Sequence, residues 1–317
     1  MEDLPNDILS TVFFKLELVD LHSVMLTCRR FHELIQDPMF VQAHNNYQTL
    51  LPSGMLLYTI SLRDGTQRIR LFGDDYAEIA LKGYPYPRVR INGFPYMCVL
   101  KGIVCAYKEE LWLWNPALVT KIHIPTDGSG SGTTGLAWYN GELLVIKIAQ
   151  IFSTANNTWT TIQNNTVLHT TTGCCDMIYK NMPYFSAIRN GKPVVVSFLA
   201  GLNQFRTLAL PDEVSLRTTT RLFLNDEGIG LCCLVGSTID IWSLTVRDKW
   251  LWTNKIKVGG ISEIIGYLGT GNLVLLIDGD VAVFDTITNR VITRFDLDKK
   301  EYLFCKAFKF RYSIVRI

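Results

Sequence analysis

Residues that form metal and redox sites are scarce in this chain of 317 residues. Histidine occurs only five times, and no two histidines have the spacing of a helical metal-ligand pair with a third ligand near. The eight cysteines form no Cys-x-x-Cys pair. Charged residues make up 19% of the chain and the net charge is +2, so no bulk field attracts nucleic acid. The sequence therefore predicts no metal, no cofactor and no nucleic-acid partner.

Long apolar runs are also missing. No stretch approaches the ~18 uninterrupted apolar residues that a membrane-spanning helix needs, so we expect no membrane partner. The first 15 residues mix charges with a helical pattern and do not resemble a signal peptide. The cysteines include two adjacent doublets in strand-like runs, which is typical of small core residues in a reducing compartment. We therefore expect the protein in the cytoplasm, the nucleus or both.

Catalytic patterns are sparse too. The sequence contains no Gly-x-Ser-x-Gly elbow of the kind that exposes a nucleophilic serine. Gly130–Gly135 matches Gly-x-Gly-x-x-Gly, but Leu136–Leu143 after it reads as strand, turn and strand. Pyrophosphate binding needs a helix amino terminus at that place. We therefore interpret the glycines as a loop, assign no catalytic residue and predict a non-catalytic protein.

Apolar residues are abundant near the amino terminus, where they make up 17 of the 32 residues between positions 4 and 35. Their spacing of three and four predicts three short helices, over residues 6–15, from a cap at Asp20, and over residues 28–36. Asp37-Pro38 is expected to end the third helix. Units below ~40 residues rarely hold a core alone. Part of this surface should therefore face either the rest of the chain, as a helical cap, or a second protein.

The order and spacing of these residues resemble an F-box from residue 4 to about residue 38. The resemblance rests on Leu4-Pro5-x-Asp7-Ile8-Leu9, Val12-Phe13, Asp20-Leu21 and Cys28-Arg29-Arg30-Phe31. F-boxes dock on the Skp adaptor of cullin–RING ubiquitin ligases, so the resemblance implies the Skp adaptor, and through it a cullin and a RING protein, as partners. The positions that it assigns to adaptor contact or its support are Leu4, Pro5, Ile8, Leu9, Phe13, Leu16, Leu21, Val24, Cys28 and Phe31.

After about residue 50 the pattern becomes that of strands. Six apolar hairpins begin near residues 57, 112, 151, 194, 239 and 281. The last four intervals lie between 39 and 45 residues, which is the length of a four-stranded propeller blade. We predict an α+β, mainly β chain, with a three-helix region at residues 1–45 and an all-β propeller-like domain of about six blades at residues 46–317. An irregular pair of Greek-key sandwiches is the alternative.

Three segments of the β region are similar to plant F-box-associated domains. They are Gly102–Ala117, Leu231–Thr253 and Val274–Asp285. This resemblance implies a kelch-like propeller that recruits a protein target. Together the two resemblances imply a substrate-recognition subunit of a Skp–cullin–F-box ubiquitin ligase, with an unknown protein as its substrate. A non-ligase interaction protein and a glycan-binding propeller stay open as alternatives.

Aromatic residues give the candidates for substrate contact. All seven tryptophans lie in the β region, and we expect most of them to pack blade against blade. The segments Gly83–Arg88 and Asn181–Phe185 combine tyrosine with proline and are predicted to be loops. Tyrosine and arginine are favoured at the energetic centres of interfaces. The candidate substrate-binding residues are Tyr84, Tyr86, Arg88, Tyr184 and Phe185.

Overall fold

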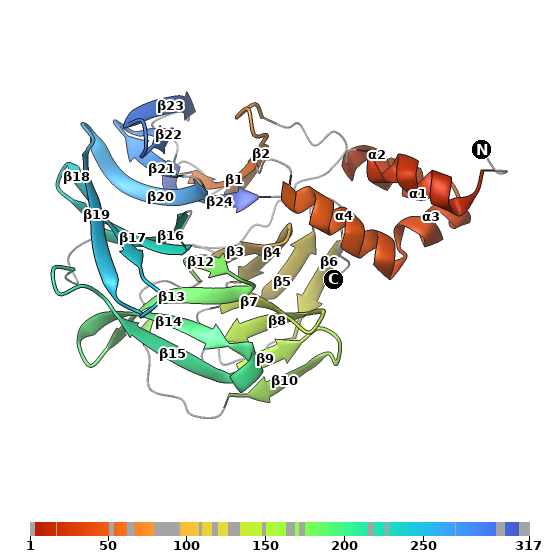
Figure 1. The fold of residues 1–317 in the computed structure, drawn as a ribbon, viewed down its shortest axis with the longest axis horizontal. Coiled ribbons are helices and arrows are strands. Elements are labelled where there is room, and N and C mark those ends of the chain that lie inside the picture. The colour runs from red at the N-terminus through yellow and green to blue at the C-terminus, as the bar shows by residue number, and fades with distance from the viewer. Residues whose placement is uncertain are drawn as a thin grey trace.

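The computed structural model has a helical region that projects from one side of a larger β domain (Figure 1). The described residues are 4–16, 18–50, 54–61, 67–78, 96–107, 110–115, 120–125, 134–147, 150–162, 169–170, 175–214, 219–225, 228–269, 271–295 and 302–310. Within these ranges, no helix is both long and apolar enough to cross a membrane. The chain therefore has the predicted order, a short helical part followed by a mainly β part.

The helical region contains four helices and a core of its own. The helices are α1 (Asn6–Phe14), α2 (Leu18–Met25), α3 (Arg29–Ile35) and α4 (Pro38–Leu50). The first three confirm the predicted helices, although Asp20 lies inside the first turn of α2 and not at its cap. The side chains buried between the helices are Leu9, Phe13, Leu21, Met25, Ile35 and Phe40.

The sequence from residue 39 to about residue 50 predicts only a last helical turn and a junction, whereas helix α4 has 13 residues. Its start is set by Asp37, whose Oδ1 accepts hydrogen bonds from the backbone nitrogens of Met39 at 2.8 Å and Phe40 at 3.2 Å. Pro38 takes the first helical position, where a missing N–H costs nothing. The same Asp37-Pro38 pair therefore ends α3 and begins α4. The predicted domain boundary at residue 45 falls inside α4 and stays a prediction.

Four sheets of consecutive antiparallel strands make up most of the described β domain. Their strands are, sheet by sheet, β3 (Tyr96–Leu100), β4 (Ile103–Tyr107), β5 (Leu111–Asn115) and β6 (Thr120–Ile124); β7 (Thr134–Tyr139), β8 (Glu142–Lys147), β9 (Gln150–Ser153) and β10 (Thr158–Thr161); β11 (His169–Thr170), β12 (Met177–Tyr179), β13 (Met182–Arg189), β14 (Lys192–Leu199) and β15 (Gln204–Ala209), with the 3-10 turn Ala200–Leu202 before β15; and β16 (Thr219–Asn225), β17 (Gly228–Val235), β18 (Thr238–Leu244) and β19 (Trp250–Lys257).

A fifth, seven-stranded sheet joins the two ends of the β domain. Its strands are β2 (Gln67–Phe72), β1 (Gly54–Ser61), β24 (Tyr302–Phe310), β20 (Ile261–Gly269), β21 (Asn272–Ile277), β22 (Asp280–Asp285) and β23 (Arg290–Phe295), in that order. The contact between β20 and β24 is parallel and covers only two residue pairs. The sheet therefore consists of two blades, β20–β23 and β24-β1-β2.

The inner strands of the six blades form a closed ring. In turn, β24 contacts β3, β3 contacts β7, β7 contacts β13, β13 contacts β16, and β16 contacts β20, which returns to β24. The antiparallel pairing of β1 with β24 completes the last blade from both ends of the domain. The six predicted hairpins are confirmed as the pairs β1–β2, β5–β6, β9–β10, β14–β15, β18–β19 and β22–β23. The propeller prediction is thereby confirmed over the Greek-key alternative.

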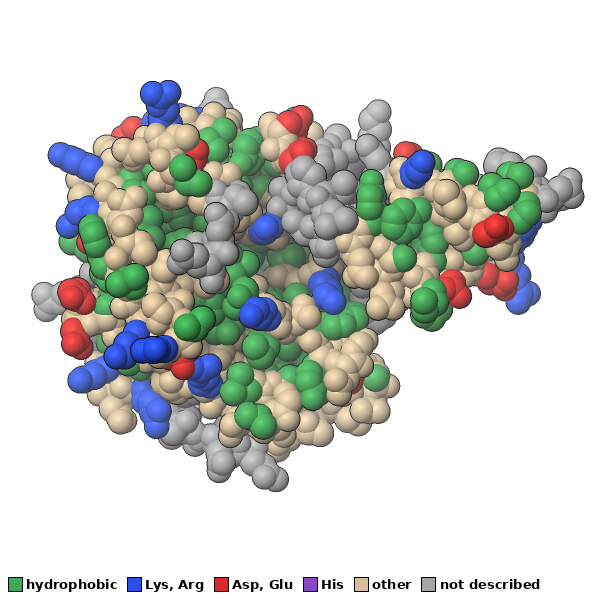
Figure 2. Space-filling model, in the orientation of Figure 1, with side chains coloured by type: hydrophobic (Ala, Val, Ile, Leu, Met, Phe, Trp, Pro, Cys, Tyr) green, Lys and Arg blue, Asp and Glu red, His purple; other side chains and the backbone are tan. Residues whose placement is uncertain are grey.

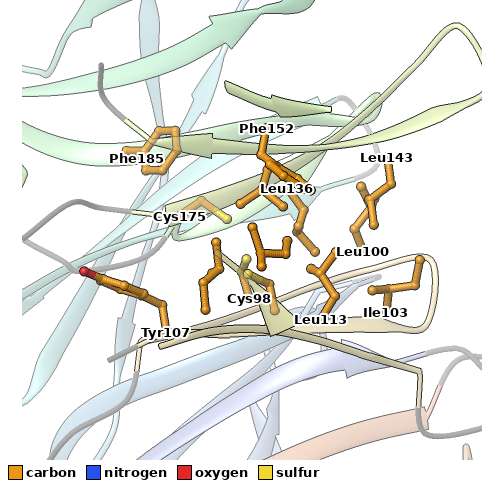
Figure 3. Close-up of a cluster of buried hydrophobic side chains, with 14 residues drawn as sticks. Cys98, Leu100, Ile103, Tyr107, Leu113, Leu136, Leu143, Phe152, Cys175 and Phe185 are labelled. Carbon is orange, nitrogen blue, oxygen red and sulfur yellow. The ribbon is translucent and has the colours of Figure 1, made fainter. Parts of the chain in front are cut away.

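Close packing between blades fixes the ring. A Cβ atom at Gly266 would lie 2.2 Å from the carbonyl oxygen of Ala307, so only glycine lets β20 approach β24 this closely. Between the sheets β3–β6 and β7–β10 lies a cluster of buried side chains that includes Cys98 and Cys175 (Figure 3). Cys98, Cys105, Cys175, Cys232 and Cys233 are buried, which agrees with their predicted role as small core residues.

Candidate functional site

Helix α1 has one face in the helical core and one face open to solvent. Leu9 and Phe13 are 1% and 4% exposed. Ile8 and Val12, one turn apart, are 46% and 50% exposed, and Leu4 just before the helix is 38% exposed. Since residues four apart lie on the same side of a helix, Ile8 and Val12 point the same way. Together with Leu4 they form an apolar surface that we call the open face.

Contacts with α3 hold α1 in this orientation. Arg30 of α3 donates hydrogen bonds to the carbonyl oxygen of Leu4 and to Oδ1 of Asn6, the latter from Nη2 at 2.8 Å and from Nε at 3.1 Å. Two turns further along α1, the rings of Phe13 and Phe31 meet edge to face with centroids 5.0 Å apart. The open face therefore belongs to a helix that is fixed at both ends.

The structure divides the ten predicted adaptor residues into three groups. The exposed ones are Leu4, Pro5, Ile8 and Cys28. Those buried in the helical core are Leu9, Phe13 and Leu21, and the half-buried ones packed on that core are Leu16, Val24 and Phe31. Burial gives the second group a supporting role in this state of the chain. Adaptor contact by these residues stays a prediction, because no partner is present in the structure.

Two exposed apolar residues, Val12 and Leu26, are absent from the ten predicted adaptor residues. Val12 lies on the open face, and Leu26, which follows α2, is 73% exposed. The spacing of Val12, four residues after Ile8, was a sufficient signal for its place. Leu26 lies in the turn between α2 and α3, outside any helical periodicity, so no pattern in the sequence indicated its exposure.

The open face is not sealed against the β domain. In Figure 1, α4 leads toward the β domain, and α1, α2 and α3 extend away from it. Figure 2 shows hydrophobic side chains at the surface of this projecting part. The exposure of Ile8 and Val12 therefore argues against the alternative of a helical cap whose apolar surface is buried on the propeller. An exposed apolar face of this kind marks an interaction surface.

A buried histidine lies on the other side of the helical core. His44 of α4 is 0% exposed. Its ring lies 5.8 Å from that of Phe14 and 5.9 Å from that of Phe40, between centroids. Neither ring nitrogen has a hydrogen-bond partner among the described residues. Burial lowers the pKa of His44 below its ordinary value, because the apolar surroundings disfavour the charged ring.

The structure describes only two of the five candidate substrate-binding residues. Tyr84, Tyr86 and Arg88 lie outside the described residues. The predicted loop around Tyr184 and Phe185 is wrong, because residues 182–189 form strand β13. These two side chains are 8% and 2% exposed. Their role in substrate binding stays a prediction, and their burial speaks against direct contact.

Metal-binding groups do not gather in the described part of the chain. Within these residues, no three histidine, cysteine, aspartate or glutamate side chains lie where they could share a metal ion. The open face therefore remains the one surface for which sequence pattern and geometry point to the same place.

Comparison with known proteins bears on both parts of the chain. A family model described as F-box-like matches residues 1–43. The chain carries an N-terminal F-box-like domain. Among solved structures, a chain of the nidogen/laminin complex superposes with a TM-score of 0.51 at 10% identity, over 80% of this chain and 98% of that chain. At this identity the likeness shows the fold alone, and that fold is a β-propeller.

A second solved structure is more distant. The extracellular domain of a putative one-component system from B. thetaiotaomicron gives a TM-score of 0.42 at 14% identity, over 77% of this chain and 34% of that chain. No curated protein sequence matches the chain. The F-box-like domain is thus followed by a β-rich domain with the propeller fold, and the plant and kelch-like character of that domain stays a prediction.

Proposed function

We propose that this protein is the substrate-recognition subunit of a Skp–cullin–F-box ubiquitin ligase. The observation that carries the proposal is the coincidence of two features in residues 1–43. The F-box-like match covers them, and the same helices present Leu4, Ile8 and Val12 to solvent beside a core of their own. The helical region is therefore folded and still has apolar surface to offer to an adaptor.

The chemistry of such a complex belongs to its partner enzymes. This chain would contribute proximity, with the helices holding the Skp adaptor and the propeller holding a protein substrate. Holding a substrate lysine near the charged conjugating enzyme raises its effective concentration without any catalytic group on this chain. The protein is proposed as a non-enzymatic receptor because catalysis is assigned to the partner enzymes and binding to this chain.

The open face supplies part of the apolar area that a stable joint needs. Fully burying one leucine, isoleucine or valine side chain is worth roughly 1.5–3 kcal/mol before the costs of association. Leu4, Ile8 and Val12 are each between 38% and 50% exposed, so docking would bury only the remaining part of each side chain. Leu26 and Cys28 at the turn before α3 would extend the contact. Several partial burials of this size are needed together. The F-box resemblance agrees with this, because it assigns adaptor contact to many residues.

The β domain is proposed as the part that binds the substrate, in the manner implied by its resemblance to plant F-box-associated, kelch-like propellers. In this proposal residues 1–45 are the adaptor-binding part and residues 46–317 the substrate-binding part. A ligase subunit of this kind would work in the cytoplasm, the nucleus or both.

Retention of a purified Skp adaptor by the full chain tests the adaptor role. Ile8→Asp places a charge on the open face, and we expect it to lower adaptor affinity at least tenfold. Met39→Asp is the matched control, because Met39 is 73% exposed on α4 and outside the predicted contact set. Leu9→Asp is unsuitable, since Leu9 is 1% exposed and a buried charge would unfold α1. An Ile8→Asp chain that retains the adaptor as well as Met39→Asp would refute the proposal.

A further inference from the structure

The outer edge of one blade has features of a second docking site. Strand β19 pairs with β18 and with no other described strand. It has 8 residues, against 6 in β2, 5 in β6, 4 in β10, 6 in β15 and 6 in β23, the other described outer strands. A free edge presents unpaired backbone N–H and C=O groups to any extended segment that reaches it. At a rise of ~3.3 Å per residue, the strand is about 26 Å long, with a register shift at Thr253 and with the backbone N–H of Lys255 bonded to Oδ1 of Asn254 at 2.8 Å.

Large apolar side chains on β19 are unusually open. Leu251 is 60% exposed and Trp252 is 54% exposed. The neighbouring Trp250 is held in place by a hydrogen bond from its indole nitrogen to the carbonyl oxygen of Ala209, at 2.7 Å. Because successive residues of a strand point to opposite faces, Leu251 and Trp252 offer one apolar contact on each side of an added strand. Tryptophan is among the residues most enriched at binding hot spots.

The charges along the edge determine which net charge a partner segment should carry. Lys249, Lys255 and Lys257 are exposed on or next to β19. Of the two carboxylates within residues 238–257, Asp248 is paired with Arg206, and Asp240 lies 3.4 Å from Nζ of Lys255. The edge therefore keeps a positive surplus. Lysine on an edge strand opposes pairing with a second copy of the same edge, because lysines would then face lysines, but it attracts a strand that carries carboxylates.

We propose that β19 binds an extended acidic segment of a partner protein by strand addition. The segment would pair its backbone with the free edge, place apolar side chains against Leu251 and Trp252, and direct carboxylates toward Lys249 and Lys257. The proposal deepens the receptor role and rests on it only in naming this partner as a substrate. The binding itself requires no adaptor.

Three labelled peptides test the edge on the full chain by fluorescence anisotropy. The first is an acetylated decapeptide that alternates glutamate with valine, the second alternates lysine with valine, and the third is the glutamate peptide with alternate backbone nitrogens methylated. We expect the glutamate peptide to bind at least tenfold more tightly than the other two. Methylation removes backbone donors and leaves the charge intact. Equal binding of the methylated peptide, or no binding of the glutamate peptide, would overturn the proposal.

Charge reversal supplies a second readout that misfolding cannot imitate. Lys249→Glu with Lys257→Glu is expected to weaken the glutamate peptide at least tenfold and to create binding of the lysine peptide. Lys121→Glu with Arg290→Glu makes the same change of net charge on β6 and β23, and we expect it to leave the preference unchanged. If this control pair shifts the preference equally, the attraction is general to the surface and β19 is not the site.

The two proposals can fail separately. A chain that binds the Skp adaptor but not the glutamate peptide keeps the receptor role and loses the β19 site. A chain that binds the glutamate peptide by the stated criteria but not the adaptor keeps the β19 site and loses the ligase role.

Discussion

The indole nitrogen of Trp250 donates a hydrogen bond to the carbonyl oxygen of Ala209 at 2.7 Å, and this bond joins the outer strands of two neighbouring blades. The same relationship recurs in the ring, where the indole nitrogen of Trp159 donates to the carbonyl oxygen of Pro125 at 2.6 Å. In both cases a tryptophan on the outer strand of one blade reaches the residue that ends, or directly follows, the outer strand of the blade before it. These bonds fit the expected role of the tryptophans in packing blade against blade.

Replacing Trp250 by phenylalanine is expected to loosen that joint. A typical intramolecular hydrogen bond contributes about 0.5–1.5 kcal/mol, and 1 kcal/mol corresponds to about 2–4 °C in Tm for a domain of this size. We therefore expect Trp250→Phe to lower Tm by a few degrees in thermal denaturation. Trp252→Phe is the control, since the structure gives the exposed Trp252 indole no hydrogen bond among the described residues. Equal Tm values for the two variants would contradict the proposed joint.

The six hairpins were predictable because each one is local. Alternating apolar residues and a turn between them lie within about 20 residues of sequence, as in β18–β19. The closing pair β1–β24 joins residues 54–61 to residues 302–310, and no local periodicity indicates that pairing. The length of helix α4 was underestimated for another reason, because Pro38 was interpreted only as the end of α3. A proline at the first turn also begins helices.

For the candidate sites, too, the features that depend on local spacing were predictable and those that depend on the packing of distant elements were not. Helical spacing could place Ile8 on a face with Leu4, but it could not separate Ile8, which is exposed, from Leu9, which is buried. That separation depends on how α3 and α4 pack on α1. The loop prediction for Tyr184 failed because Pro183 was taken as a loop signal, whereas Pro183 occupies a strand position opposite Ile178. The free edge of β19 depends on which strand ends its blade, which only the fold reveals.

Arg30 is expected to hold α1, and with it the open face, in a fixed conformation. Its guanidinium bonds Leu4 and Asn6 at the start of α1, and hydrogen bonds to charged groups contribute about 1.5–3 kcal/mol. Arg30→Ala should raise the amide exchange rate of α1 at least tenfold in hydrogen-exchange mass spectrometry. Arg29→Ala is the matched control, because that side chain is 92% exposed and pairs with Glu33 of its own helix, one turn along. Similar exchange in both variants would show that Arg30 does not hold α1.

The exposed and the buried cysteines should differ in their reactivity. Cys28 is exposed. Burial raises the pKa of Cys232 to about 12, and a hydrogen bond with Cys98, together with burial, raises the pKa of Cys175 well above its ordinary value. The thiolate is the reactive form, so at pH 8 iodoacetamide should alkylate Cys28 and leave Cys175 and Cys232 unmodified until the chain is denatured. Peptide mass spectrometry measures this directly. Bound Skp adaptor should protect Cys28, and modification that is unchanged by the adaptor would count against contact there.

His44 is expected to make the helical region sensitive to acid. In the unfolded chain its pKa is about 6.5, while burial lowers the pKa in the folded chain. As the pH falls below 6.5, the unfolded state therefore binds a proton that the folded state does not bind. The free energy of unfolding then falls by up to about 1.4 kcal/mol per pH unit, until the pH reaches the folded pKa. Above pH 6.5 the ring is neutral in both states and has no effect.

Hydrogen-exchange protection factors of α4, measured at pH 7.5 and pH 5.5, report this loss. We expect protection to fall between the two values in the wild-type chain and to stay nearly level in His44→Phe. Phenylalanine keeps an aromatic ring between Phe14 and Phe40, removes the titrating group, and removes two buried nitrogens that lack partners among the described residues. His44→Phe should therefore also be more stable at neutral pH, because an unpaired buried polar group costs about 1–3 kcal/mol. A variant with the wild-type pH dependence would place the acid-sensitive group elsewhere.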